Sequence, residues 1–344
     1  MGVKFQFISF LITISVITVI SSCNKSDGEK AERVITNYYE DPNTADKSKS
    51  IALDTALYNR LQMHLVHNKP SGKWPVKSAY PLPGAIIPFK RIVAYYGNFY
   101  TRNMGVLGQQ PTSAMLLRLQ QEASKWEQAD PTVPVIAAIH YIAVTAQRRP
   151  GLNNKYRLRM PDHEIKKAIA LAHSINAIVF LDVQVGHSTL QEELPALEPY
   201  LSMPNVHLGI DPEYSMKHGE VPCATIGTFD AADVNYASGY LSGLVRRYSL
   251  PPKILIVHRF TKDMLSNYKH VDIRPEVQIV INMDGFGFPA KKISSYNIAV
   301  ANEPIQFTGF KLFYDNDKKT PPYRLMQPQE ILNLYPSPIY IQYQ

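Results

Sequence analysis

Acidic residues stand at the ends of two apolar runs near the middle of the chain. Asp182 lies at the end of the run 177–183, and Asp211 and Glu213 follow the run 206–210. Two carboxylates two residues apart on one face of a strand lie roughly 6 to 7 Å apart at the backbone. Such a pair can divide its pKa values, so that one group keeps a proton while the other is ionised. We therefore predict Glu213 as a general acid, with Asp211 or Asp182 as the nucleophile or orienting carboxylate.

Polar and aromatic side chains also end the other apolar runs of the sequence. Tyrosines beside carboxylates suit a sugar ring, which offers apolar faces for stacking and hydroxyls for hydrogen bonds. Each residue has a simpler explanation when taken alone: Asp182 as a turn cap, Asp284 before Gly285 as a turn pair, and His258 as a hydrogen-bonded core residue. Their recurrence at successive strand ends favours a ligand site. The predicted substrate-binding residues are Asp284, His258, Lys311, Asp315, Tyr95, Tyr96, Tyr141 and Gln184.

The elements that must position these residues alternate between apolar strands and amphipathic helices. This alternation over about 250 residues predicts an α/β fold of the (β/α)8 or TIM-like barrel type, in which the strand ends share one face. An open doubly wound sheet is the alternative, but no glycine-rich dinucleotide fingerprint follows the first strand. The eighth strand has two candidates, 224–228 and 296–301. The seven expected strands are 91–97, 134–144, 177–183, 206–211, 253–260, 277–285 and 307–315.

Composition excludes several classes of protein. The 344 residues carry a formal net charge of +7 without a basic helix or recognition motif, so we expect no nucleic-acid partner. There is no HxH, no HExxH and no Cys/His cluster, and we predict no metal and no cofactor. A serine hydrolase is unsupported because the G-x-S-x-G elbow does not occur.

The first 22 residues have the pattern of an export signal. Lys4 gives a positive start, and an apolar run of signal-peptide length follows it up to Ile20. The sequence Ile20-Ser21-Ser22-Cys23 resembles a bacterial lipobox. The resemblance implies that Cys23 becomes the first mature residue and carries lipid, which would anchor the protein to a membrane. Asn24 in place of aspartate implies the outer membrane, and an uncleaved N-terminal anchor is the alternative.

The remaining chain is predicted to have three parts after the signal peptide at 1–22. Residues 23–50 are rich in charged and small polar residues and are expected to form a tether. Residues 51–90 combine leucines at helical spacing with a proline-rich stretch, which predicts a helical extension. Residues 91–344 form the predicted barrel domain.

One short motif resembles a known family. Asp211-Pro212-Glu213 resembles the closing acid-x-acid of the chitinase-type barrel signature. In that family the final glutamate protonates the leaving oxygen, and the preceding aspartate orients the substrate's amide. The earlier acids of the signature are replaced here by Gly209 and Val206. The chain from residue 91 onward also resembles uncharacterised secreted bacterial barrel proteins, which lend no mechanism.

Two functions are compatible with these observations. The first is a lipid-anchored, glycoside-hydrolase-like enzyme of the cell envelope that acts on a glycan. The second is a non-catalytic lipoprotein that binds a glycan or another small polar ligand on the same barrel. Fold alone does not separate them. Facing carboxylates in an open pocket favour the enzyme, and an aromatic groove without them favours the binding protein.

Overall fold

The computed structural model describes residues 52–344 as a closed barrel of eight parallel strands. The predicted export signal, Cys23 and the tether lie outside the described residues. The strands follow one another around the barrel in chain order, and the last pairs with the first. The predicted TIM-like fold is therefore confirmed. The barrel strands are β1 (Arg91–Gly97), β2 (Val135–Ala146), β4 (Ile178–Val183), β5 (Val206–Ile210), β7 (Lys253–Arg259), β9 (Val277–Met283), β10 (Phe307–Leu312) and β11 (Tyr340–Tyr343).

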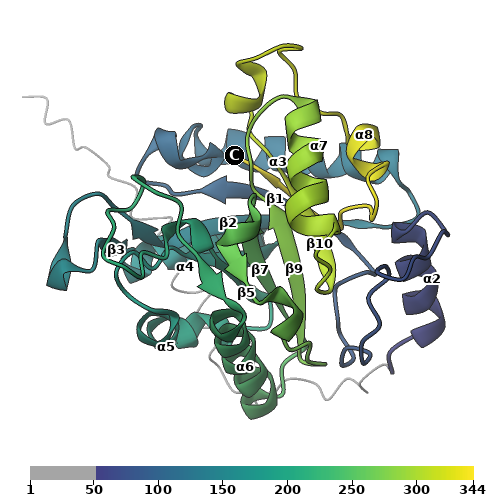
Figure 1. Cartoon of the computed structure of the whole chain (residues 1–344), viewed down its shortest axis with the longest axis horizontal. Coiled ribbons are helices and arrows are strands. Elements are labelled where there is room, and N and C mark those ends of the chain that lie inside the picture. The colour runs from purple at the N-terminus through teal and green to yellow at the C-terminus, as the bar shows by residue number, and fades with distance from the viewer. Residues whose placement is uncertain (1–51) are drawn as a thin grey trace, which may run out of the picture.

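Helices connect most of these strands across the outside of the barrel (Figure 1). Between β7 and β9 the described chain forms no α-helix and has two 3-10 turns, at Lys262–Met264 and Tyr268–His270, with the short strand β8 (Leu265–Ser266) between them. No helix within residues 52–344 is long and apolar enough to cross a membrane. The helices are α2 (Thr55–Leu65), α3 (Thr112–Ala129), α4 (Asp162–Ser174), α5 (Leu190–Leu201), α6 (Ala231–Tyr248), α7 (Pro289–Tyr296) and α8 (Pro328–Leu332). Short additional strands are β3 (Arg157–Arg159), antiparallel to β2, and the pair β6 (Phe229–Asp230) and β8 (Leu265–Ser266).

Neither candidate for the eighth strand was correct. Residues 224–228 belong to the loop after β5, and residues 297–301 continue α7 as a π-helix. The second segment is helical because Tyr296, Ala299 and Val300 bury one side of it against the barrel. The actual strand, β11, has only four residues, and its sequence YIQY has one aliphatic residue and one glutamine between two tyrosines instead of an aliphatic run.

The core consists of two shells. The outer shell lies between the strands and the helices, and the inner shell fills the barrel. Helix α2 belongs to the inner shell, because Tyr58, Leu61 and Leu65 pack with Ile92 and Ile254 at the beginnings of β1 and β7. Asp54 caps this helix by accepting a hydrogen bond from the Leu57 amide at 2.8 Å. The segment before β1 therefore closes the amino-terminal end of the barrel.

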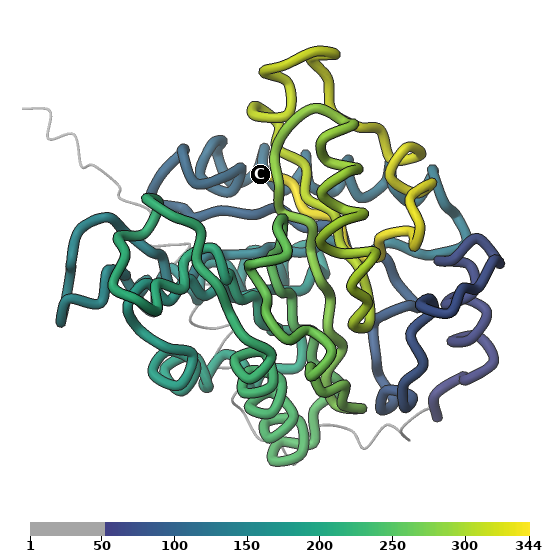
Figure 2. Tube along the Cα trace, viewed as in Figure 1, coloured from purple at the N-terminus to yellow at the C-terminus, as the bar shows by residue number. Residues whose placement is uncertain are grey.

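Residues from the two ends of the described chain lie side by side (Figure 2). The Ser337 amide donates to the Leu65 carbonyl at 2.7 Å, and His67 Nε2 lies 3.0 Å from the Leu334 carbonyl. Trp74 Nε1 donates to the Ala301 carbonyl at 2.7 Å. The first two bonds join the α2 region to the segment before the last strand, and the third joins Trp74 to the end of the helical segment before β10.

Candidate functional site

Polar side chains fill the carboxyl-terminal half of the barrel interior. Seven of the eight barrel strands contribute one, and β5 contributes Gly209 in the same region. Inward positions alternate with outward ones along each strand, so these residues lie two positions after inner-shell residues, as His258 does after Ile256; Lys311 instead follows Gly309. The polar residues are Tyr96, His140, Asp182, His258, Asn282, Lys311 and Gln342, and all are buried.

Asp182 contacts three of the other buried groups. The Tyr96 hydroxyl donates to Asp182 Oδ2 at 2.9 Å. The Nε2 atoms of His140 and His258 lie 3.2 and 3.3 Å from Asp182 Oδ1. Burial alone would raise the pKa of Asp182, but His258 and His140 outweigh burial and hold it well below its ordinary value. Asp182 is therefore a buried carboxylate that does not reach the surface of the pocket described below.

The two buried histidines that contact Asp182 differ in charge. Burial lowers the pKa of His140 to about 4, although Asp182 acts in the opposite direction. Burial also disfavours the charge on His258, but Asp182 and Asp284 outweigh it and raise the pKa of His258 to about 10. At neutral pH, His140 is neutral and His258 is a cation between two carboxylates.

Asp284 lies between His258 and a buried lysine. His258 Nδ1 is 2.8 Å from Asp284 Oδ2, and Lys311 Nζ is 2.8 Å from Asp284 Oδ1. The same ammonium lies 3.9 Å from the centre of the Tyr96 ring. Burial acts to raise the pKa of Asp284, but the charges of Lys311 and His258 lower it overall. Asp284 is therefore held ionised by two cations.

A pocket of about 650 Å³ opens above this network at the carboxyl-terminal ends of the strands. That is the face of a TIM-like barrel at which enzymes of this fold carry their active sites. Its aromatic lining includes Tyr214, Phe260, Phe286 and Phe313. Six of the predicted site residues line it together: Tyr96, Gln184, Asp211, Glu213, Asp284 and Lys311.

Glu213 and Asp211 reach the pocket from the end of β5. Glu213 lies in a short 3-10 turn, Pro212–Tyr214, which Asp211 caps by accepting a hydrogen bond from the Glu213 amide at 3.0 Å. Burial, reinforced by the charge of Asp284, raises the pKa of Glu213 to about 7. Burial also raises the pKa of Asp211 well above its ordinary value, and nearby carboxylates add to this effect. Both groups hold a proton more strongly than free carboxyl groups do.

Five predicted site residues do not line the pocket. Asp182 and His258 lie in the buried network beneath it, and the other three are Tyr95, Tyr141 and Asp315. Tyr95 and Tyr141 belong to the outer shell, where the Tyr95 and Tyr314 hydroxyls are 3.0 Å apart and Tyr141 stacks on Phe99. Neighbouring residues of a strand face opposite sides, so Tyr96 inside places Tyr95 outside. Asp315 is exposed beyond the end of β10 and borders a smaller hollow of about 220 Å³.

Sequence reasoning missed three members of the buried network: His140, Tyr340 and Gln342. His140 Nδ1 lies 2.6 Å from the Tyr340 hydroxyl and 3.0 Å from Gln342 Nε2. His140 could have been found, because it is the one ionisable side chain other than tyrosine within the apolar run 134–144. The two residues of β11 had no such signal, because their strand was not recognised.

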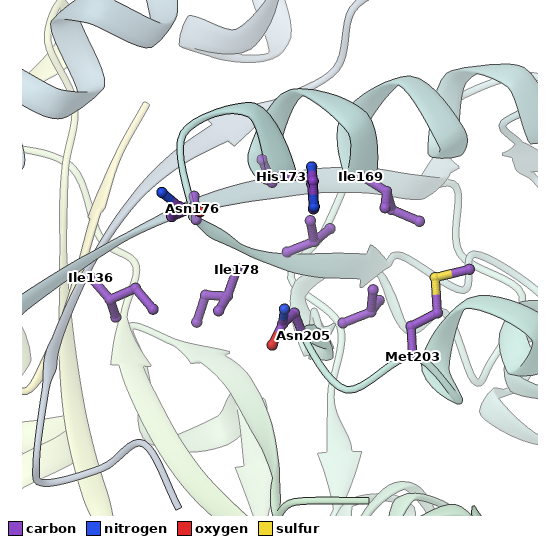
Figure 3. A pocket seen from close by; sticks show the side chains of 11 residues that line it. Ile136, Ile169, His173, Asn176, Ile178, Met203 and Asn205 are labelled. Atoms are coloured by element: carbon purple, nitrogen blue, oxygen red, sulfur yellow. The ribbon is translucent and has the colours of Figure 1, made fainter. Parts of the chain in front are cut away.

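A second pocket, of about 330 Å³, lies at the opposite end of the strands, where Ile178 and Asn205 border it beside the end of α4 (Figure 3). Its labelled apolar residues include Ile136, Ile169 and Met203, and its polar ones are His173, Asn176 and Asn205. None of the residues that line it carries a carboxylate. Of these two pockets, only the one at the carboxyl-terminal face therefore has the carboxyl pair needed for acid/base chemistry.

Comparisons with known proteins do not identify a family for the chain. No protein-family model matches the chain, and the curated proteins contain no match. Among solved structures, GH26C from Muricauda sp. MAR_2010_75 matches with a TM-score of 0.34 and 9% sequence identity, over 84% of this chain and 82% of that chain. A likeness this distant carries no information about the chemistry of this chain.

Proposed function

We propose that the protein is a glycoside hydrolase of the cell envelope that acts on a glycan. The observation that carries the proposal is the presence of two carboxyl groups with opposite properties in one open pocket. Glu213 keeps its proton because it is largely buried, and Asp284 is ionised because it contacts Lys311 and His258. Glycoside hydrolysis requires one carboxylic acid and one carboxylate around the bond to be cleaved.

In this mechanism Glu213 donates its proton to the glycosidic oxygen as the bond to the anomeric carbon breaks. Asp284 stabilises the positive charge that develops on the sugar ring, and water adds its hydroxyl to the anomeric carbon while its remaining proton returns to the carboxylate of Glu213. Asp284 takes the role for which the sequence suggested Asp211 or Asp182, because Asp182 does not line the pocket and burial raises the pKa of Asp211, which favours its neutral form. The rings of Phe286 and Phe313 provide apolar surfaces for a sugar face.

A glycan array followed by hydrolysis of the bound glycans tests this function. Wild type should bind a subset of glycans and cleave at least one of them. Glu213→Gln keeps the shape of the side chain but cannot donate the proton, so it should bind the same glycans and turn them over at least ~10²-fold more slowly. Tight binding without cleavage by wild type would support the binding-protein alternative. Equal cleavage by both proteins would exclude Glu213 as the acid.

We also propose that the enzyme is anchored to the outer membrane through lipid on Cys23. The support is the Ile20-Ser21-Ser22-Cys23 sequence and Asn24, which lie outside the described residues. Cys23→Ala should abolish the incorporation of a labelled fatty acid and leave a precursor of unchanged length. Incorporation equal to that of wild type would refute the anchor. Sedimentation of wild type with inner-membrane vesicles would refute its assignment to the outer membrane.

A further inference from the structure

Directly beneath the proposed active site lies a group of side chains with metal-ligating chemistry. His140 Nε2, a carboxylate oxygen of Asp182 and His258 Nε2 lie within 4.8 Å of one another, and all three side chains are fully buried. We propose that these residues, from β2, β4 and β7, bind one divalent transition-metal ion such as Zn²⁺. This site does not depend on glycoside hydrolysis, because neither Glu213 nor a sugar takes part in it.

The two contacts of Asp182 Oδ1 are long for charge-assisted hydrogen bonds and have the spacing of ligand atoms around a shared metal. Asp182 Oδ1 lies 3.2 Å from His140 Nε2 and 3.3 Å from His258 Nε2. Charge-assisted N–H···O bonds are about 2.7–2.9 Å long, and the His258–Asp284 contact nearby is 2.8 Å. Ligand atoms that are about 2.0–2.1 Å from a tetrahedral zinc lie about 3.3 Å from each other. His258 Nε2 is also buried without a hydrogen-bond partner of acceptable geometry.

Gly209 leaves space beside the ligand atoms. A Cβ atom at this position would lie 2.4 Å from both Asp182 Oδ1 and His140 Nε2. Any other residue at this point of β5 would therefore occupy the volume between the carboxylate and the imidazole. The second oxygen of Asp182 already accepts a hydrogen bond from the Tyr96 hydroxyl at 2.9 Å, which leaves Oδ1 directed at the cluster.

Each imidazole has an oxygen close to its Nδ1 atom. A ligating imidazole presents the lone pair of Nε2 and keeps its proton on Nδ1, where a carboxylate or another oxygen accepts it, so His258 would release its Nε2 proton as the ion binds. Asp284 Oδ2 lies 2.8 Å from His258 Nδ1. The Tyr340 hydroxyl oxygen lies 2.6 Å and Gln342 Nε2, a donor, 3.0 Å from His140 Nδ1, so on metal binding His140 would give up the Gln342 contact and donate from Nδ1 to Tyr340. Each histidine therefore has an oxygen that can orient it toward a shared ion.

The donor set also limits which ion can bind. Two imidazoles and one carboxylate suit zinc and related first-row metals, whereas Mg²⁺ and Ca²⁺ prefer sites made of oxygen alone. Because the cluster is fully buried, the ion would enter as the barrel folds and would stabilise the folded state. The ligands are 42 and 76 residues apart in the chain, so no short metal-binding motif announces them.

Metal content is the direct test. Wild type that is unfolded in denaturant with a chelator, refolded in the presence of Zn²⁺ and then dialysed should retain about one zinc per chain. Asp182→Asn and His258→Gln should each lower the affinity for zinc by at least ~100-fold, since even the loss of an outer contact costs 10–100-fold. His207→Gln is the matched control, because His207 is a buried histidine of β5 outside the cluster. It should retain zinc as wild type does.

X-ray absorption at the zinc edge keeps the proposal testable if the ligand variants do not fold. The spectrum of zinc-loaded wild type should show two imidazoles, an oxygen ligand and no sulfur. A wild type that retains no zinc would overturn the proposal. Equal zinc retention by Asp182→Asn and His258→Gln, or a spectrum with a sulfur ligand, would also overturn it, because the metal would then lie elsewhere.

Discussion

The two halves of the barrel interior are built from the same strands but contain different kinds of residue. In the amino-terminal half, Ile178 and Phe180 of β4 and Ile254 and Ile256 of β7 point inward and pack against one another. In the carboxyl-terminal half, the next inward positions of the same strands hold charged or polar groups. One half therefore stabilises the fold by excluding water. The other half retains buried charges, which are tolerated only because each has a partner.

This contrast extends to the two pockets. The pocket at the carboxyl-terminal face contains Asp211, Glu213, Asp284 and Lys311, whereas no carboxylate borders the pocket at the opposite end. A cavity alone therefore says little about function in this molecule. The chemistry follows from which groups near the cavity have shifted pKa values and from the contacts that shift them.

The largest effect should come from removing the charge of Asp284. Asp284→Asn keeps the size of the side chain but removes the carboxylate that faces the developing positive charge. Turnover of a cleaved glycan should fall by at least ~10³-fold, the upper range for the loss of one electrostatic partner. Asp315→Asn is the matched control, since Asp315 is exposed outside the pocket, and its rate should equal that of wild type. If Asp284→Asn and Asp315→Asn turned over the glycan at equal rates, Asp284 would not be a catalytic carboxylate.

A substitution that creates a cavity in the amino-terminal half of the barrel should lower stability and leave turnover almost unchanged. Ile254→Ala removes a fully buried side chain from the inner shell and should lower the free energy of unfolding by about 2–5 kcal/mol. Denaturant unfolding measures the loss. Turnover at a temperature where the variant is folded should stay within a few-fold of the wild-type value. If folded Ile254→Ala lost as much turnover as Asp284→Asn, the amino-terminal half of the barrel interior would also be needed for the reaction, and the proposed difference between the two halves would be wrong.

The protonated Glu213 should appear in the pH dependence of stability. Its pKa is about 7 in the folded protein against an ordinary value of 4.5, so the folded state holds this proton more strongly than the unfolded state. The resulting stabilisation is complete below the ordinary value and is lost as pH rises through about 7. Between about pH 4 and pH 8, wild type should therefore lose about 1–3 kcal/mol more stability than Glu213→Gln. Parallel stability curves for the two proteins would contradict the raised pKa.

The smallest expected effect on kcat/KM concerns the two neighbouring tyrosines of β1, which should respond differently to substitution. Tyr96 lies in the pocket and donates a hydrogen bond to Asp182, whereas the Tyr95 hydroxyl contacts Tyr314 in the outer shell. Tyr96→Phe should lower kcat/KM by about 10-fold, since it leaves a buried carboxylate without one donor. Tyr95→Phe should leave kcat/KM unchanged. A larger loss from Tyr95→Phe would show that the outer shell controls the reaction.

The fold was predictable because seven strands are apolar runs separated by helices of regular spacing. The eighth was not, because YIQY places Tyr340 and Gln342 inward and has too few residues for a periodic signal. A short strand of this kind is specified by its pairing with β1 and β10 more than by its own composition.

The candidate site was predictable in part for a similar reason. Strand ends identified Asp211, Glu213 and Asp284, which do reach one pocket. The direction of each side chain was harder to assign, because tyrosine is equally suited to either shell, and Tyr95 and Tyr141 face outward. The partners of a buried group lie on other strands, so the Asp284–Lys311 and Asp182–His140 contacts appear only in three dimensions.

Titration of Glu213 itself tests the central claim most directly. The carboxyl carbon of Glu213 can be followed by NMR across the pH range in wild type and in Asp284→Asn. Wild type should show a pKa of about 7, and the pKa should fall in the variant because the charge of Asp284 helps to raise it. A wild-type pKa near the ordinary value of 4.5 would contradict the claim that this pocket keeps a proton on Glu213 for glycoside hydrolysis.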